Sequence, residues 1–99
     1  MKKFTLQDKV AVVTGAARGL GYNMAQALSQ SGAKAIAILD MRPELGAESA
    51  TELQNATGLP VKYYNVDIRD EHLVSEVVAN VVADFGSVDV LINSAGIAE

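Results

Sequence analysis

Residues 10–21 read Val-Ala-Val-Val-Thr-Gly-Ala-Ala-Arg-Gly-Leu-Gly, and this stretch decides the fold. The continuous apolar run Val10–Val13 is typical of a strand buried on both faces, and Thr14-Gly15 ends it. Apolar residues at helical spacing follow from Gly19 to Ser31, and Gly32 stands where a helix commonly ends. We therefore expect a strand, a glycine-rich turn and a helix, which together make the first unit of an α/β fold.

The rest of the chain alternates predicted strands with predicted helices. Strands are expected at 35–39, closed by Asp40, at 61–66 and at 88–92, and helices at 44–57, after Pro43, and at 70–85. Short connections between alternating elements imply parallel strands joined by right-handed crossovers. The expected fold is a Rossmann-like parallel sheet of four strands in the order 3-2-1-4 with three helices. It is incomplete relative to a full doubly wound domain, and residues 1–99 are expected to form one dinucleotide-binding segment.

The composition is that of a soluble globular chain, with 49% hydrophobic and 20% charged residues. A net charge of −4 opposes general attraction to nucleic acid or to an anionic membrane. No cysteine is present and the one histidine, His72, is expected on the polar side of a helix, so no metal site is predicted. The N-terminal residues are too few and too polar for a signal peptide or a membrane span, and the cytoplasm is the expected location.

The three glycines of the turn suit a dinucleotide-binding loop. Gly15 permits a tight turn off the strand, Gly19 lets the backbone approach a pyrophosphate, and Gly21 allows the helix to pack closely on the sheet. The N–H groups at the start of the helix would then face the anion. The alternative is an ordinary glycine-rich turn between a strand and a helix, because a glycine pattern by itself is common.

Asp40 strengthens the dinucleotide interpretation. It ends the second strand about 20 residues after the glycines, where an acidic side chain accepts hydrogen bonds from an adenosine ribose. The alternative is a solvated aspartate at a strand end that caps the Met41-Arg42 turn.

Four features in register resemble the N-terminal half of the short-chain dehydrogenase/reductase family. They are the glycine pattern from Thr14 to Gly21, Asp40 at the end of the second strand, Val66-Asp67-Ile68 after the third, and Asn93-Ser94-Ala95-Gly96 after the fourth. The three-residue gap between Gly15 and Gly19 is similar to that of the compact members. The amino-acid sequences of segments 37–40 and 84–93 are similar to those of the corresponding segments in fungal polyol and sugar reductases.

The resemblance implies further contacts with the cofactor. Asp67 would hydrogen-bond the adenine amino group, Ile68 would pack on the ring, and Asn93 would lie beside the adenosine ribose. Ser94 stands where the family usually has asparagine. From the residues alone, Asp67 could equally cap the helix expected at 70–85. The candidate cofactor-binding residues are Gly15, Arg18, Gly19, Leu20, Gly21, Asp40, Asp67, Ile68, Asn93, and the small residues Ala95 and Gly96 that would leave room for the cofactor.

The charges leave the cofactor open between NAD and NADP. Asp40 would repel a 2′-phosphate, whereas Arg18 and Arg42 could each pair with one. A basic residue at the position of Arg18 is common among the NADP users of the family. NAD is favoured, because an unpaired carboxylate that faces a phosphate is a direct repulsion.

The residues with which the family performs catalysis are absent from this sequence. The family transfers hydride with a serine and a Tyr-x-x-x-Lys pair, whereas Tyr22, Tyr63 and Tyr64 are followed four residues on by Gln26, Asp67 and Ile68. These tyrosines are interpreted as surface or sheet-packing residues. We expect the cofactor-binding portion of an NAD(P)-dependent oxidoreductase on alcohols or carbonyls, inactive by itself. The alternative is a non-enzymatic nucleotide-binding or interaction module that is complete at 99 residues.

The strand expected at 88–92 also predicts self-association. Its apolar run Val90–Ile92 would form an edge of the sheet, without the charges or proline with which proteins protect exposed strands.

Overall fold

The computed structural model describes residues 7–15 and 19–93, in which strands and helices alternate as expected. The elements are β1 (Val10–Thr14), α1 (Gly19–Gln30), β2 (Ala35–Asp40), α2 (Pro43–Thr57), β3 (Val61–Asn65), α3 (Glu71–Phe85) and β4 (Val90–Asn93). The sequence-based bounds agree with these to within one residue, except that β4 begins two residues later than expected.

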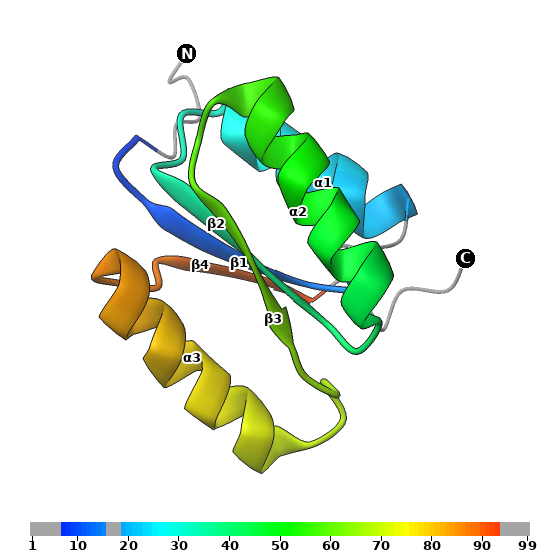
Figure 1. The fold of residues 1–99 in the computed structure, drawn as a ribbon. Coiled ribbons are helices and arrows are strands. Elements are labelled where there is room, and N and C mark those ends of the chain that lie inside the picture. The colour runs from blue at the N-terminus through cyan, green and yellow to red at the C-terminus, as the bar shows by residue number, and fades with distance from the viewer. Residues whose placement is uncertain (1–6, 16–18, 94–99) are drawn as a thin grey trace.

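The strands form one parallel sheet in the order β3-β2-β1-β4. Val12 of β1 pairs with Ala37 of β2 on one side and with Leu91 of β4 on the other. Helices α1 and α2 cover one face of this sheet, and α3 covers the other (Figure 1). The predicted Rossmann-like fold, with four strands in the order 3-2-1-4 and three helices, is confirmed.

The core consists of two apolar layers, one on each face of the sheet. Every residue of β1 and β2 is buried, because alternate side chains of a strand enter opposite layers. Ile38 packs beneath α1 and α2 with Leu53 of α2. Leu39 packs on the opposite face with Val81 of α3. Burial on both faces holds the carboxyl ends of the two central strands side by side.

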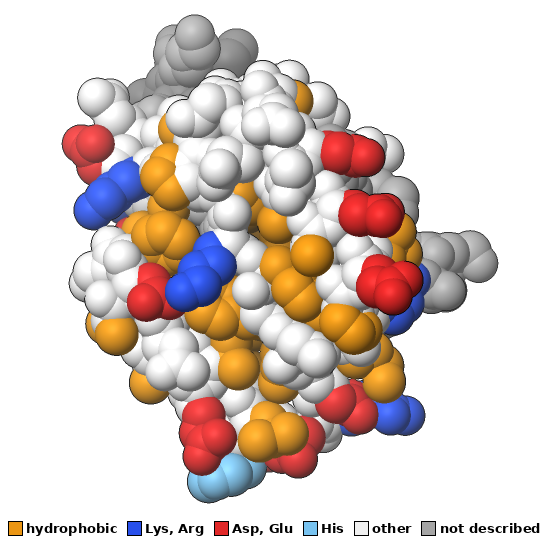
Figure 2. All heavy atoms as spheres, viewed as in Figure 1, with side chains coloured by type: hydrophobic (Ala, Val, Ile, Leu, Met, Phe, Trp, Pro, Cys, Tyr) orange, Lys and Arg blue, Asp and Glu red, His pale blue; other side chains and the backbone are white. Residues whose placement is uncertain are grey.

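Helix α3 covers its face of the sheet less completely than α1 and α2 cover theirs. Asp70 caps it by accepting a hydrogen bond of 3.1 Å from the backbone N–H of Leu73. Val81 is its buried residue, while the side chains of Leu73 and Val82 are exposed. Figure 2 shows hydrophobic side chains that gather between α2 and α3 above the edge strand β3.

Within the described ranges, no helix has the length and apolar character that a bilayer crossing requires.

Candidate functional site

The predicted site residues gather at the edge of the sheet where the parallel strands end. Thr14 at the end of β1 pairs with Leu39 of β2 and with Asn93 of β4. Asp40 at the end of β2 pairs with Asn65 of β3. Because carboxyl ends of parallel strands meet at one edge, the glycine turn, Asp40 and the segment after β3 become neighbours. Arg18, Ala95 and Gly96 lie outside the described residues.

The turn after β1 has the conformation that its glycine was expected to supply. Gly15 has a φ of 72°, in the left-handed region that side chains disfavour. Its N–H donates a hydrogen bond of 2.7 Å to the carbonyl oxygen of Leu39, which holds the start of the turn against the end of β2. Gly19, Leu20 and Gly21 form the first turn of α1. The strand, the left-handed glycine directly after it and the helix that a phosphate-binding loop requires are therefore present within the described residues.

Asp40 is a buried carboxylate held by the arginine two residues after it. Its Oδ1 accepts hydrogen bonds from the backbone N–H and from Nε of Arg42, at 2.9 and 3.0 Å, and its Oδ2 accepts one of 2.8 Å from Nη2. The Asp40 side chain is 3% exposed. It does cap the turn, as the alternative interpretation expected, but it is not solvated. The argument for NAD assumed an unpaired carboxylate, and the structure shows a paired one.

Asp67 repeats this arrangement after the neighbouring strand. Its Oδ1 accepts from the backbone N–H and from Nε of Arg69, both at 3.0 Å, and its Oδ2 accepts from Nη2 at 2.8 Å. The Arg69 side-chain bonds hold the pKa of this carboxyl at about 2, below its usual 3.8. The alternative role of helix cap belongs to Asp70 instead. Ile68, half-buried, packs against the apolar layer beneath α3.

Tyr63 supports the end of β2 from the edge strand β3. Its hydroxyl donates a hydrogen bond of 2.8 Å to the carbonyl oxygen of Asp40. Burial raises the pKa of this phenol, and the nearby Asp40 carboxylate raises it further. The expectation that Tyr63 and Tyr64 pack on the sheet is confirmed; the side chain of Tyr22 is not described. His72 is 83% exposed, as predicted.

Sequence reasoning missed Arg69 and the supporting role of Tyr63. The signal for Arg69 was available, because Asp-x-Arg occurs after two neighbouring strands, at 40–42 and at 67–69. No comparable signal marks Tyr63, whose hydroxyl reaches its partner only through the pairing of β2 with β3.

The donor set fits the adenosine half of a dinucleotide. A carboxylate at the end of the second strand can accept hydrogen bonds from ribose hydroxyls. A glycine turn that opens a helix beside it can bind a pyrophosphate. Asp40 and Gly15 provide both parts in this structure. The part of the chain that the structure describes holds no group of three or more His, Asp or Glu side chains able to bind a metal ion.

Comparisons with known proteins agree with this geometry. The family model for short chain dehydrogenases matches residues 9–99. Sorbose reductase SOU1 of Candida albicans is 35% identical over 96 residues, which cover 96% of this chain and 33% of that protein. This fungal sugar reductase gives loose support to the narrower resemblance. The chain spans about a third of the length of the curated relatives it matches.

Two solved structures share the fold closely. L-sorbose reductase from Gluconobacter frateurii, complexed with NADPH and L-sorbose, superposes with a TM-score of 0.86 and 32% identity, covering 96% of this chain and 36% of that one. An NAD⁺-bound xylitol dehydrogenase gives a TM-score of 0.80 and 35% identity, covering 87% of this chain and 32% of that one. Structures similar to this chain thus include one bound to each of the two cofactors.

Proposed function

The chain belongs to the short-chain dehydrogenase family, and from this premise we propose that it is the dinucleotide-binding portion of an NAD(P)-dependent oxidoreductase acting on alcohols or carbonyl compounds. One observation carries the proposal: the buried carboxylate of Asp40 lies at the strand end next to the Gly15 turn. Arg42 compensates the burial of this charge, so the proposal rests on where the carboxylate lies, at the end of the second strand beside a glycine turn that opens a helix.

Different residues at the sheet edge would bind different parts of the cofactor. The turn from Gly15 to Gly21 holds the pyrophosphate, and Asp40 accepts the hydroxyls of the adenosine ribose. Asp67 and Ile68 hold the adenine, and Asn93 lies on the ribose side. The bound nicotinamide would supply the hydride acceptor or donor of the reaction. We propose NAD as the favoured cofactor because Asp40 places an acceptor for ribose hydroxyls at the strand end; since Asp40 is paired with Arg42, repulsion of a 2′-phosphate is not the reason.

Polyols and sugars are the substrate class that we propose. The likeness to L-sorbose reductase and to xylitol dehydrogenase supports this choice. We expect the 99-residue chain by itself to bind the cofactor without measurable turnover, because none of its tyrosines is followed four residues on by lysine. A positioned proton donor typically contributes about 10²–10⁴-fold to such a reaction.

Calorimetric titration of the chain with NAD⁺ and with NADP⁺ tests the proposal. We expect saturable binding of NAD⁺, which Asp40→Ala weakens by about tenfold because ribose hydrogen bonds to a charged group are lost. Glu52→Ala is the matched control, since Glu52 is an exposed carboxylate of α2 away from the strand ends. Failure of the parent chain to bind either cofactor, or equal weakening by both variants, would contradict the assignment.

A further inference from the structure

The side chain of Tyr63 bonds to the backbone of the residue that the proposed function assigns to the ribose. Its hydroxyl donates a hydrogen bond of 2.8 Å to the carbonyl oxygen of Asp40. The backbone N–H of Val66 donates to the same oxygen at 3.1 Å. One backbone donor and one side-chain donor, both from the segment that begins with β3, therefore hold this carbonyl at the end of β2.

The Asp40 carbonyl connects the strand to the turn that carries the carboxylate. The carboxylate accepts hydrogen bonds from the backbone N–H, Nε and Nη2 of Arg42, and these bonds fix it relative to the turn at 40–42. Because peptide units are planar, only the two backbone rotations of Met41 separate the Asp40 carbonyl from the Arg42 N–H. The direction of that carbonyl therefore sets how the turn, and the carboxylate with it, lies on the strand end.

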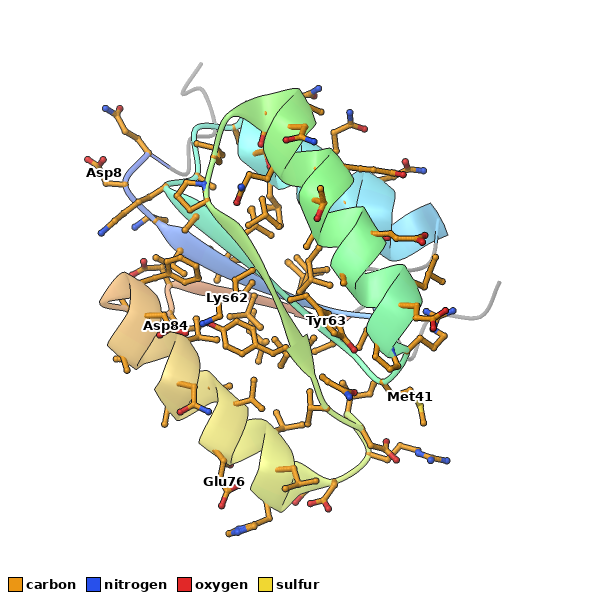
Figure 3. All side chains as sticks on the ribbon, in the orientation of Figure 1. Asp8, Met41, Lys62, Tyr63, Glu76 and Asp84 are labelled. Carbon is orange, nitrogen blue, oxygen red and sulfur yellow. The ribbon has the colours of Figure 1, made fainter. Side chains whose placement is uncertain are left out.

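Tyr63 is itself held in place by the elements around it. Its backbone lies in β3, where Tyr63 pairs with Ile38 of β2. Its ring lies against Gly46 of α2, where a Cβ atom would overlap the ring (Figure 3). Burial raises the pKa of the phenol, so the hydroxyl keeps the proton that it donates. A donor locked by packing is the kind of support that holds a binding group in a defined orientation.

Resting on the proposed function, we infer that Tyr63 is a positioning residue for the ribose: through the Asp40 carbonyl it holds the Asp40 carboxylate in the orientation that receives the ribose hydroxyls. Hydrogen bonds weaken steeply as their geometry departs from the ideal, so a carboxylate that is turned away binds the ribose less well. Loss of the Tyr63 hydroxyl weakens this contact without abolishing it, because the N–H of Val66 still holds the carbonyl.

Tyr64 supplies a matched control in the same strand. It is the next residue of β3, and its side chain packs in the apolar layer on the opposite face of the sheet. Its hydroxyl donates a hydrogen bond of 2.6 Å to Asp84 of α3. Tyr64→Phe therefore removes a phenol hydrogen bond from β3, as Tyr63→Phe does, but at a different partner. A general loosening of β3 should follow from both substitutions, whereas a change in the Asp40 carboxylate should follow only from Tyr63→Phe.

The experiment measures the dissociation constant of NAD⁺ for the 99-residue chain and its variants by calorimetry, with far-UV circular dichroism to check folding. Tyr63→Phe should raise the constant by about three- to tenfold, the scale of one hydrogen bond, and Tyr64→Phe should leave it unchanged. In an Asp40→Ala background Tyr63→Phe should have no further effect, because the carboxylate that it positions is gone. If Tyr63→Phe fails to fold, Gly46→Ala, which displaces the ring but keeps its hydroxyl, carries the test with the same expectations.

The outcomes separate this inference from the proposed function. A folded Tyr63→Phe chain that binds NAD⁺ as tightly as the parent overturns the role of Tyr63 and leaves the cofactor site standing. Weakening by the same factor with and without Asp40, or equal weakening by Tyr64→Phe, also overturns it, because Tyr63 would then act on the fold and not through the carboxylate. A parent chain that does not bind NAD⁺, or an Asp40→Ala chain that binds it unchanged, overturns the proposed ribose contact and this inference together.

Discussion

The hydroxyl of Tyr63 donates a hydrogen bond of 2.8 Å to the carbonyl oxygen of Asp40, which ties the edge strand β3 to the end of β2. The same carbonyl accepts a bond of 3.1 Å from the N–H of Val66. The Tyr63 ring lies against α2 at Gly46, where a Cβ atom would overlap the ring (Figure 3). Three elements therefore meet beside the proposed ribose-binding residue, and the absence of a side chain at Gly46 lets them meet.

Gly46→Ala should destabilise the protein by about 1–3 kcal/mol, the usual cost of overpacking a filled site. Helix propensity alone predicts the opposite sign, since alanine in a helix interior is better than glycine by roughly 1 kcal/mol. Urea unfolding of the parent and the variant, followed by circular dichroism, measures the difference. A variant that is as stable as the parent would show that the Tyr63 ring can move aside without cost.

Two substitutions of Tyr63 identify the source of that penalty. In a Tyr63→Ala background the ring is gone, so Gly46→Ala should become neutral or stabilising. Tyr63→Phe keeps the ring, so the penalty should persist in that background. By itself Tyr63→Phe should cost about 0.5–1.5 kcal/mol, the worth of one hydrogen bond. Additive effects in both backgrounds would exclude a direct contact as the cause.

A polar cluster joins β3 to α3 through Asp84. The carboxylate accepts hydrogen bonds from the Tyr64 hydroxyl at 2.6 Å and from Lys62 Nζ at 2.8 Å, and Figure 3 shows Lys62 and Asp84 between the two elements. Burial raises the pKa of Tyr64, and the bond to Asp84 raises it further. The bonds from Lys62 and Tyr64 lower the pKa of Asp84.

Asp84→Asn should lower the pKa of Tyr64 toward its usual 10.0, which ultraviolet absorbance of the phenolate measures. The raised Tyr64 pKa means that this contribution to stability is complete below pH 10.0 and is lost as the pH rises toward the folded pKa. The lowered Asp84 pKa gives a contribution that is present above pH 3.8 and is lost as the pH falls through the folded pKa. Glu76→Gln, elsewhere on α3, should leave the tyrosine titration unchanged, and an unchanged titration in Asp84→Asn would contradict the cluster.

The hydrogen bonds from Arg69 to the Asp67 carboxylate should be detectable in the titration of Asp67. Carbon-detected nuclear magnetic resonance of the side-chain carboxyl should give a pKa of about 2, and Arg69→Ala should raise it toward 3.8. Because the folded pKa is the lower one, the pair stabilises the fold above pH 3.8 and ceases to do so as the pH falls to about 2. The lowered pKa of Asp89, which depends on Val10 and Ser87, should not change in this variant. An Asp67 pKa near 3.8 in the parent would mean that the Arg69 guanidinium does not pair with Asp67 in solution.

The order of the elements could be predicted because the buried strands and the amphipathic helices have different hydrophobic patterns in the sequence. Strands β1 and β2 are buried on both faces and therefore appear as unbroken apolar runs. The start of β4 was placed two residues early because the apolar Val88 precedes the run Val90–Ile92, with only Asp89 between them. In the structure, Asp89 uses its N–H and carboxylate to bond Val10 before regular pairing starts at Val90. The hydropathy pattern does not predict that a side chain will form hydrogen bonds at the start of a strand.

The positions of the site residues followed from topology, but their partners did not. Parallel strands bring their carboxyl ends to one edge, so Gly15 and Asp40 had to be neighbours. The pairing of Asp40 with Arg42 depends on how the side chain turns back over the strand end. Spacing in the sequence allows that rotamer without requiring it. Charge arguments that treated Asp40 as an isolated carboxylate consequently overstated its repulsion of phosphate.

Strand β4 presents an apolar surface at the edge of the described sheet. It pairs with β1 on one side, and the order β3-β2-β1-β4 places it last within the described residues. Leu91 is 58% exposed and pairs with Val12, whose side chain packs in the layer beneath α3. Leu91 therefore points to the α3 face. An apolar strand at a sheet edge favours pairing with another chain.

Leu91→Lys should reduce self-association and the binding of a hydrophobic dye, because a lysine on an edge strand opposes pairing by charge and by hydration. Sedimentation velocity over a range of concentrations measures the first, and dye fluorescence the second. Leu45→Lys is the matched control, since Leu45 is 41% exposed on α2, which covers the opposite face of the sheet. We expect the control to associate like the parent. A parent chain that stays monomeric at every concentration and binds no dye would contradict association through β4, and equal effects of the two lysines would assign any association to net charge instead.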